Sequence, residues 1–156
     1  METVGLDEAT TRRVDGGAMG QVVVDIQVTN AEDLALLRRK FIKPEEVRVV
    51  RSTAIVDTGA SMLSLPPDLL DQLGLPVVRQ EPATYADGRV EMRDIHAPAT
   101  LRVLDRTVFV ELLAGHAGVP ALLGQLPLES LDYHVDPKRQ RLIPSPESPD
   151  MPMRRM

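Results

Sequence analysis

Short extended runs separated by turn residues are the feature of this sequence that most constrains its fold. The run from Gln21 to Val28 alternates apolar and polar residues, as does a strand with one buried face. The run from Val47 to Val56 is rich in β-branched residues, which favour strands. Further extended runs lie at residues 90–95, 99–103, 107–113, 133–135 and 141–143. With two or three short helices between them, these runs predict a mostly-β, barrel-like domain.

Helical spacing is confined to three short stretches. The first runs from its predicted N-cap, Asn30, to Phe41. The second opens after Pro66 and ends at Gly74, because proline suits the first turn of a helix and glycine suits its end. The third covers about residues 126–131.

The composition excludes several classes of site and partner. Aromatic residues make up only 3% of the chain, so the core must be aliphatic. The chain contains no cysteine, which rules out disulfides, thiolate metal ligands and thiol nucleophiles. Its formal net charge of −5 and its scarcity of aromatic residues argue against nucleic acid as a partner.

The length of 156 residues is close to that of one ordinary domain. We expect residues 1–18 to form a flexible leader, residues 19–144 the globular domain and residues 145–156 a proline-rich tail. The first residues lack the basic start and apolar run of a signal peptide, and no apolar run approaches the roughly 20 residues that span a bilayer. These features predict a cytoplasmic protein with no membrane partner.

One motif is a candidate for chemistry. The apolar run Ala54-Ile55-Val56 leads directly into Asp57-Thr58-Gly59, so a strand delivers a carboxylate into a tight turn. A carboxylate in such a place is costly to desolvate unless it is hydrogen-bonded or paired. Thr58 supplies a hydroxyl, and Gly59 allows another backbone to approach closely. An ordinary surface turn uses the same residue types, so the motif alone leaves both interpretations open.

A second signal lies at Asp87-Gly88, between two extended runs. An Asp-Gly pair is the strongest short-range indication of a β-hairpin. It predicts a type I′ turn, in which both central residues have a positive φ.

Four segments, taken in order, resemble one known family. Residues 55–60 (IVDTGA) are similar to the active-site motif of the retropepsin-like aspartic proteases, the single-domain relatives of pepsin, and the hairpin at residues 85–89 falls where that family carries its flap. Residues 121–124 (ALLG) resemble the family's second element, which packs behind the catalytic loop. Residues 126–143 resemble the closing helix and hairpin of bacterial and archaeal members, so the resemblance covers about residues 20–144.

The resemblance implies a retropepsin-like acid-protease barrel that hydrolyses peptide bonds. It implies that the catalytic loop consists of Asp57, Thr58 and Gly59. It also implies that an extended protein or peptide substrate is bound by Ala60, Tyr85, Ala86, Asp87, Gly88 and Arg89. Structural support for the loop would come from Leu122, Leu123 and Gly124.

The family's mechanism needs two carboxylates that hold one water between them. This chain has one Asp-Thr-Gly motif and no internal repeat, so the second carboxylate must come from Asp57 of another copy. A homodimer with the site on its twofold axis is therefore expected. Thr58 would brace the two loops against each other, as it does in the family.

One alternative function stays open: a non-proteolytic peptide-binding or dimerisation module on the same fold. The intact Asp57 motif favours the enzyme. Ser61 lacks the second glycine of a nucleophile elbow, and His96, His116 and His134 are too widely spaced for a local metal or triad motif. We expect these histidines to be scaffold residues, and we expect neither a metal nor a cofactor.

Overall fold

The computed structural model describes residues 21–154, so the predicted leader at residues 1–18 lies outside the described residues. The strands are β1 (Val22–Asn30), β2 (Val49–Val56), β3 (Leu63–Leu65), β4 (Val77–Thr84), β5 (Val90–Val103), β6 (Arg106–Ala114), β7 (Ala121–Leu123), β8 (Tyr133–Asp136) and β9 (Arg141–Pro144). The helices are α1 (Ala31–Arg38), α2 (Pro67–Leu73), α3 (Gln125–Leu131) and the 3-10 turn η2 (Pro44–Glu46). Over this part of the chain, no helix has the length and apolar character needed to cross a membrane.

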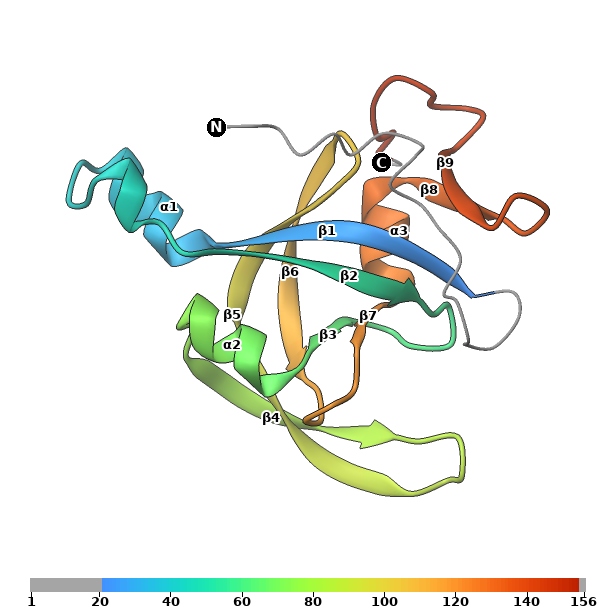
Figure 1. The fold of residues 1–156 in the computed structure, drawn as a ribbon, viewed down its shortest axis with the longest axis horizontal. Coiled ribbons are helices and arrows are strands. Elements are labelled where there is room, and N and C mark those ends of the chain that lie inside the picture. The colour runs from blue at the N-terminus through green and yellow to red at the C-terminus, as the bar shows by residue number, and fades with distance from the viewer. Residues whose placement is uncertain (1–20, 155–156) are drawn as a thin grey trace.

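Most of the strands form a closed barrel (Figure 1). The seven-stranded sheet has the order β1-β2-β7-β3-β6-β5-β4, and an additional pairing of β1 with β5 closes a ring that leaves β4 outside. β4 pairs with β5 in a long antiparallel hairpin that extends beyond the ring. β8 and β9 form a separate two-stranded sheet. The predicted mostly-β barrel with short helices is therefore confirmed.

The barrel has an aliphatic core, as the composition predicts. Val24, Ile26 and Val28 alternate along β1 and are at most 2% exposed, because alternate residues of a strand face the same side. Both phenylalanines lie at the surface: Phe41 is 72% exposed and Phe109 is 70% exposed. Packing of branched aliphatic side chains therefore holds the barrel together.

α1 begins at its predicted N-cap. The Asn30 side chain accepts a 2.9 Å hydrogen bond from the Asp33 backbone N–H, which satisfies one of the free donors at the helix start. The helix ends at Arg38 and not at Phe41 as predicted, because the chain turns through Lys40 in a left-handed conformation with φ of 63°.

The Asp33 carboxylate fixes this helix to the start of β2. The guanidinium of Arg48 donates two hydrogen bonds of 2.9 Å to it and thereby lowers the pKa of Asp33. A carboxyl group whose pKa is lower in the folded state stabilises the fold above its ordinary pKa of about 3.9. That stabilisation is lost as the pH falls through the folded-state value.

We therefore expect Asp33→Asn to lower the free energy of unfolding by about 1 kcal/mol near neutral pH, since Arg48 is half exposed. The difference from wild type should shrink progressively below about pH 4, where Asp33 of the unfolded chain takes up a proton, and vanish as the pH falls through the lowered pKa of the folded state. Urea unfolding of both proteins across this pH range measures the difference. An equal loss of unfolding free energy at all pH values would show that the charge of Asp33 contributes nothing to the stability of the fold.

A buried arginine attaches residues 145–154 to the rest of the protein. Arg106 is 3% exposed, and its guanidinium donates hydrogen bonds to the carbonyls of Leu131, Asp132 and Ser148. The Met153 backbone N–H donates a 3.0 Å hydrogen bond to the Asp132 carboxylate. The proline-rich segment therefore supplies one of the three carbonyl acceptors of a buried cation at the end of α3.

Ending the chain at Pro144 should destabilise the fold, because it removes the Ser148 carbonyl and leaves a guanidinium N–H of Arg106 without its acceptor. We expect a loss of about 1–3 kcal/mol in the free energy of unfolding. Thermal and urea unfolding measure it, with a chain that ends at Arg154 as the control. Identical unfolding of the two shortened chains would mean that the segment contributes nothing to stability.

Candidate active site

Asp57 lies where β2 leaves the wall of the barrel. β2 runs parallel to β7, with Val56 opposite Leu123, and the Asp57 N–H extends this pairing by donating to the Leu123 carbonyl at 2.9 Å. Leu123 is fully buried in the core. The backbone of Asp57 is thus fixed to a rigid part of the fold.

The carboxylate of Asp57 is held by its own turn. Its Oδ1 accepts a 2.9 Å hydrogen bond from the Gly59 N–H, and its backbone carbonyl accepts one of 3.1 Å from the Ala60 N–H. Asp57 and Ala60 are partly buried, whereas Thr58 and Gly59 are exposed. The turn therefore presents an oriented carboxylate at the surface, next to an exposed threonine hydroxyl.

The start of α3 supports the loop from behind. The N–H groups of Gly124, Gln125 and Leu126 donate hydrogen bonds of 3.1, 2.8 and 3.0 Å to the carbonyls of Met62, Ala60 and Ser61. These are donors that a helix start leaves free, so loop and helix satisfy each other's backbone groups. A Cβ atom on Gly124 would lie 2.5 Å from the Met62 carbonyl oxygen, which only glycine avoids. The structure thus brings two of the three predicted support residues, Leu123 and Gly124, against the Asp57 loop, whereas Leu122 pairs with Ile55 of β2 and Ser64 of β3.

The predicted flap is a hairpin, but its turn is not type I′. Gly88 has φ of +84°, whereas Asp87 is not among the residues with positive φ. The Gly88 N–H donates to the Tyr85 carbonyl, the Tyr85 N–H donates to the Arg89 carbonyl, and the Asp87 carboxylate accepts from the Arg89 N–H. This pattern is that of a three-residue loop that ends in a left-handed glycine, so the type I′ prediction is wrong.

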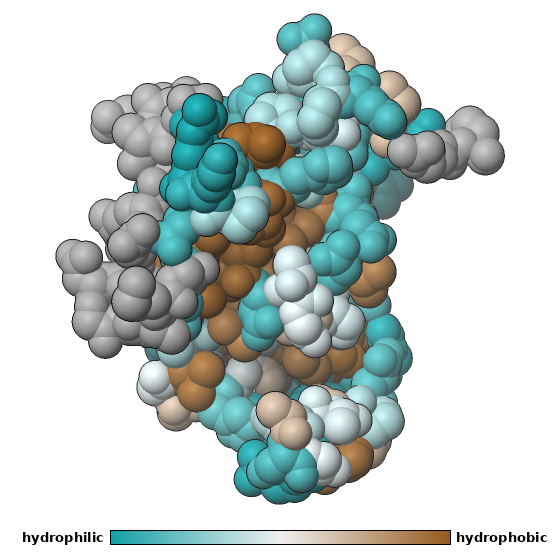
Figure 2. Space-filling view, turned by 90° about the vertical axis from the view of Figure 1, so that its right-hand side faces the viewer, coloured by the Kyte–Doolittle hydropathy of each residue, from teal (hydrophilic) through white to brown (hydrophobic). Residues whose placement is uncertain are grey.

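The flap and the loop after β2 lie on the same side of the molecule in Figure 1. Figure 2 looks onto that side and shows the hairpin as a lobe at the bottom, below a hollow in the surface. Ala86, Asp87 and Gly88 are exposed at the hairpin tip, and Tyr85 is partly buried.

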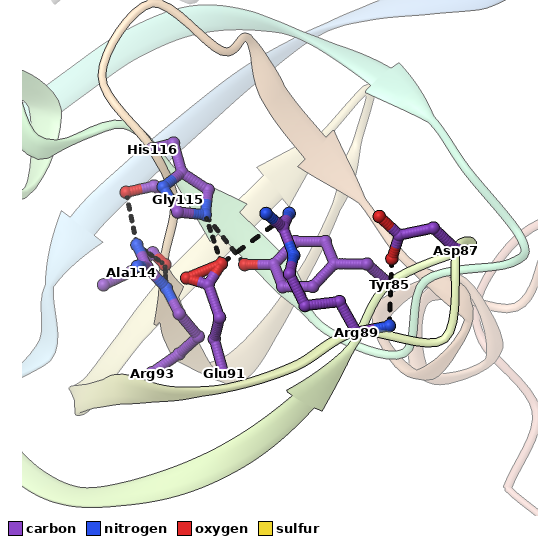
Figure 3. Close-up of polar contacts among 8 residues, drawn as sticks. All are labelled: Tyr85, Asp87, Arg89, Glu91, Arg93, Ala114, Gly115 and His116. Atoms are coloured by element: carbon purple, nitrogen blue, oxygen red, sulfur yellow. Dashed lines mark hydrogen bonds and ion pairs between the residues drawn. The ribbon is translucent and has the colours of Figure 1, made fainter.

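A polar cluster connects the flap to the loop between β6 and β7 (Figure 3). The Tyr85 hydroxyl and His116 Nε2 are 2.7 Å apart. The guanidinium of Arg89 lies over the Tyr85 ring, 4.6 Å from its centre. Glu91 Oε1 lies 3.7 Å both from Arg89 Nη2 and from His116 Nε2.

Analysis of the sequence did not single out Glu91, Arg93 or a contact of His116 with the flap. The available signal is the alternation of charged residues at positions 89, 91 and 93, which places three charges on one face of a strand. Among the described residues, no group of three or more histidine, aspartate or glutamate side chains is placed to hold a metal ion.

A family model described as Aspartyl protease matches residues 46–125 of the chain. The chain belongs to the aspartyl protease family. The matched residues extend from the last residue of η2, through the Asp57 loop and the hairpin at residues 85–89, to the first residue of α3. The family membership that the sequence motifs predicted is thereby confirmed.

Two solved structures are similar to this chain. A retropepsin-like aspartic protease from Rickettsia conorii is 17% identical, with a TM-score of 0.48 over 81% of this chain and 82% of that one. The protease of Simian Foamy Virus (mac) is 22% identical, with a TM-score of 0.39 over 50% of this chain and 80% of that one. None of the curated proteins matches the chain.

The close approach at Gly124 yields a test of how the fold positions the Asp57 loop. In Gly124→Ala, the methyl group would meet the backbone of Met62, so the loop or the start of α3 must move. We expect a loss of about 1–3 kcal/mol in the free energy of unfolding, measured by urea unfolding.

Gly118→Ala is the matched control, because a Cβ atom there meets nothing within 4 Å. Its cost should be limited to about 1 kcal/mol of left-handed strain at φ of +79°. A Gly124→Ala protein as stable as wild type would show that the loop does not depend on this contact.

Proposed function

We propose that this member of the aspartyl protease family is a homodimeric endopeptidase whose active site consists of the Asp57 carboxylates of two subunits. The observation that carries the proposal is a single, oriented and surface-accessible Asp57 in each chain. Two such carboxylates are needed to hold and activate one water, and the sequence offers no second Asp-Thr-Gly motif.

In the proposed mechanism, two neighbouring carboxylates share one proton because like charges at close range cannot both ionise. The ionised Asp57 takes a proton from the water, which attacks the carbonyl carbon of the scissile peptide bond. The protonated Asp57 donates a hydrogen bond to the carbonyl oxygen, where negative charge develops. Collapse of the tetrahedral intermediate breaks the C–N bond, and a proton passes to the leaving nitrogen.

The surrounding residues have matching roles in this proposal. Thr58 contacts the loop of the other subunit, and Gly59 permits the two loops to approach. Ala60 lines the floor of the cleft. An extended peptide lies between this floor and the flap, which closes over it and excludes water.

The direct test is Asp57→Asn, which removes the charge and keeps the size and hydrogen-bonding capacity of the side chain. Cleavage of a denatured protein substrate, assayed from acidic to neutral pH, should fall by at least about 10²–10⁴-fold. The variant should remain a dimer in sedimentation, because the substitution removes a repulsion between like charges. A variant that still cleaves would exclude Asp57 from the mechanism.

Mixing tests whether the site is shared between subunits. Excess Asp57→Asn chain added to a fixed amount of wild type should lower the wild-type activity, because most wild-type chains then pair with a chain that lacks the carboxylate. An equal mass of an unrelated protein is the control. Unchanged activity in the mixture would mean that one chain suffices for catalysis.

An inactive wild type that still dimerises and binds peptide would instead favour the alternative function, a non-proteolytic peptide-binding or dimerisation module.

A further inference from the structure

The inner face of the flap carries a row of polar side chains. Arg89 directly precedes β5, and Glu91 and Arg93 lie at its start; because these three residues alternate along extended chain, their side chains share one face. The same alternation continues into Ile95 and Ala97, which are 0% and 2% exposed in the core. The polar row therefore lies on the side of the flap that faces the body of the protein.

Two sets of hydrogen bonds join this face to the loop between β6 and β7, and Glu91 Oε1 also lies 3.7 Å from His116 Nε2 of that loop. Near the tip, Tyr85 and His116 form the 2.7 Å hydrogen bond. Nearer the barrel, the guanidinium of Arg93 donates hydrogen bonds of 2.9–3.1 Å to the carbonyls of Ala114 and Gly115. In Figure 3, both contacts lie on the same side of the hairpin.

The loop that receives these contacts is itself fixed to the barrel. The Gly115 N–H donates a 2.8 Å hydrogen bond to the Leu65 carbonyl, and a Cβ atom on Gly115 would lie 3.0 Å from the same oxygen. Leu65 is fully buried at the end of β3. His116, the next residue, therefore offers the flap an anchor that the barrel holds in place.

A two-stranded hairpin that extends beyond its sheet is only marginally stable on its own. The Arg93 contact fixes the base of the flap, but the tip lies eight residues away along the chain at Tyr85. The hydrogen bond between Tyr85 and His116 ties the tip to the barrel, and Glu91 Oε1 lies 3.7 Å from the same His116 Nε2. The hydrogen bond forms with either neutral tautomer of His116, since a phenol both donates and accepts.

We propose that His116 is a positioning residue. Its hydrogen bond with Tyr85, called here the latch, holds the tip of the flap in place relative to the barrel of the same subunit. The proposal rests on the proposed function, in which the flap covers the substrate. A latched flap is already ordered when peptide arrives, so substrate binding does not have to supply that ordering. The latch opens each time peptide enters or leaves.

The latch can be tested without any catalytic activity, by hydrogen–deuterium exchange of the backbone amides at residues 84–92. Tyr85→Phe removes only the hydroxyl, and His116→Leu removes the ring nitrogen. Each should speed exchange of the flap amides about fivefold, the factor for one net hydrogen bond, and the double variant should be no faster than either single one. His116→Gln keeps a polar group that can hydrogen-bond the Tyr85 hydroxyl and should restore slow exchange.

His134→Leu is the control, because His134 is exposed on β8 and outside the latch. The melting temperatures of all these variants should stay close to that of wild type, since the pair is only partly buried. Unchanged flap exchange in Tyr85→Phe and His116→Leu would overturn the latch, as would additive effects in the double variant.

Peptide cleavage by the same variants separates positioning from general damage. KM should rise about fivefold in Tyr85→Phe and His116→Leu, with kcat within about twofold of wild type. A fall in kcat with unchanged KM would overturn the positioning role. If the wild-type protein does not cleave peptides, the proposed function fails while the exchange experiment still decides the latch.

Discussion

The hydrogen bonds between the Asp57 loop and the start of α3 are the constraint on which the rest of the site depends. Residues 57–62 leave the barrel after β2 and return to it at β3, and three backbone donors of residues 124–126 hold their carbonyls. No side chain takes part in these three bonds. They therefore place only a steric requirement on the sequence: position 124 must have no Cβ atom. For this reason the placement of Asp57 depends on a glycine 67 positions later in the chain.

The barrel links this loop to the flap through elements that are adjacent in space but distant in sequence. β7 touches β2 on one side and β3 on the other, and β3 also pairs with β6, whose end carries the anchor of the flap. A shift of β7 would therefore move the Asp57 loop and the Gly115–His116 anchor together. The short strands β3 and β7, of three residues each, are where the site and the flap share one support.

Local features of this fold could be predicted from the sequence because each depends on a few neighbouring residues. The Asn30 side chain caps α1, and Gly74 ends α2 in a left-handed conformation that its lack of a Cβ atom permits. The hairpin at Asp87-Gly88 was predictable for the same reason, but its turn type was not, because a type I′ turn and a three-residue loop both use a left-handed glycine. The contacts of Tyr85 with His116 and of Arg106 with Ser148 span 31 and 42 residues. They depend on strand register and barrel closure, which cannot be predicted from the local residue patterns of one sequence.

The exposure of the Asp57 loop also limits how a second copy can reach it in the proposed dimer. Thr58, Gly59 and Ser61 are exposed, whereas the chain is partly buried at Met62 and fully buried at Leu63. A partner can therefore approach the loop at residues 58–61. Because the hydrogen bonds to Leu123 and to the start of α3 hold the opposite side of the loop, such a contact would press these residues against a rigid support. The two carboxylates would then be positioned by the fold of each subunit, and binding energy from the dimer interface would not be consumed in ordering either loop.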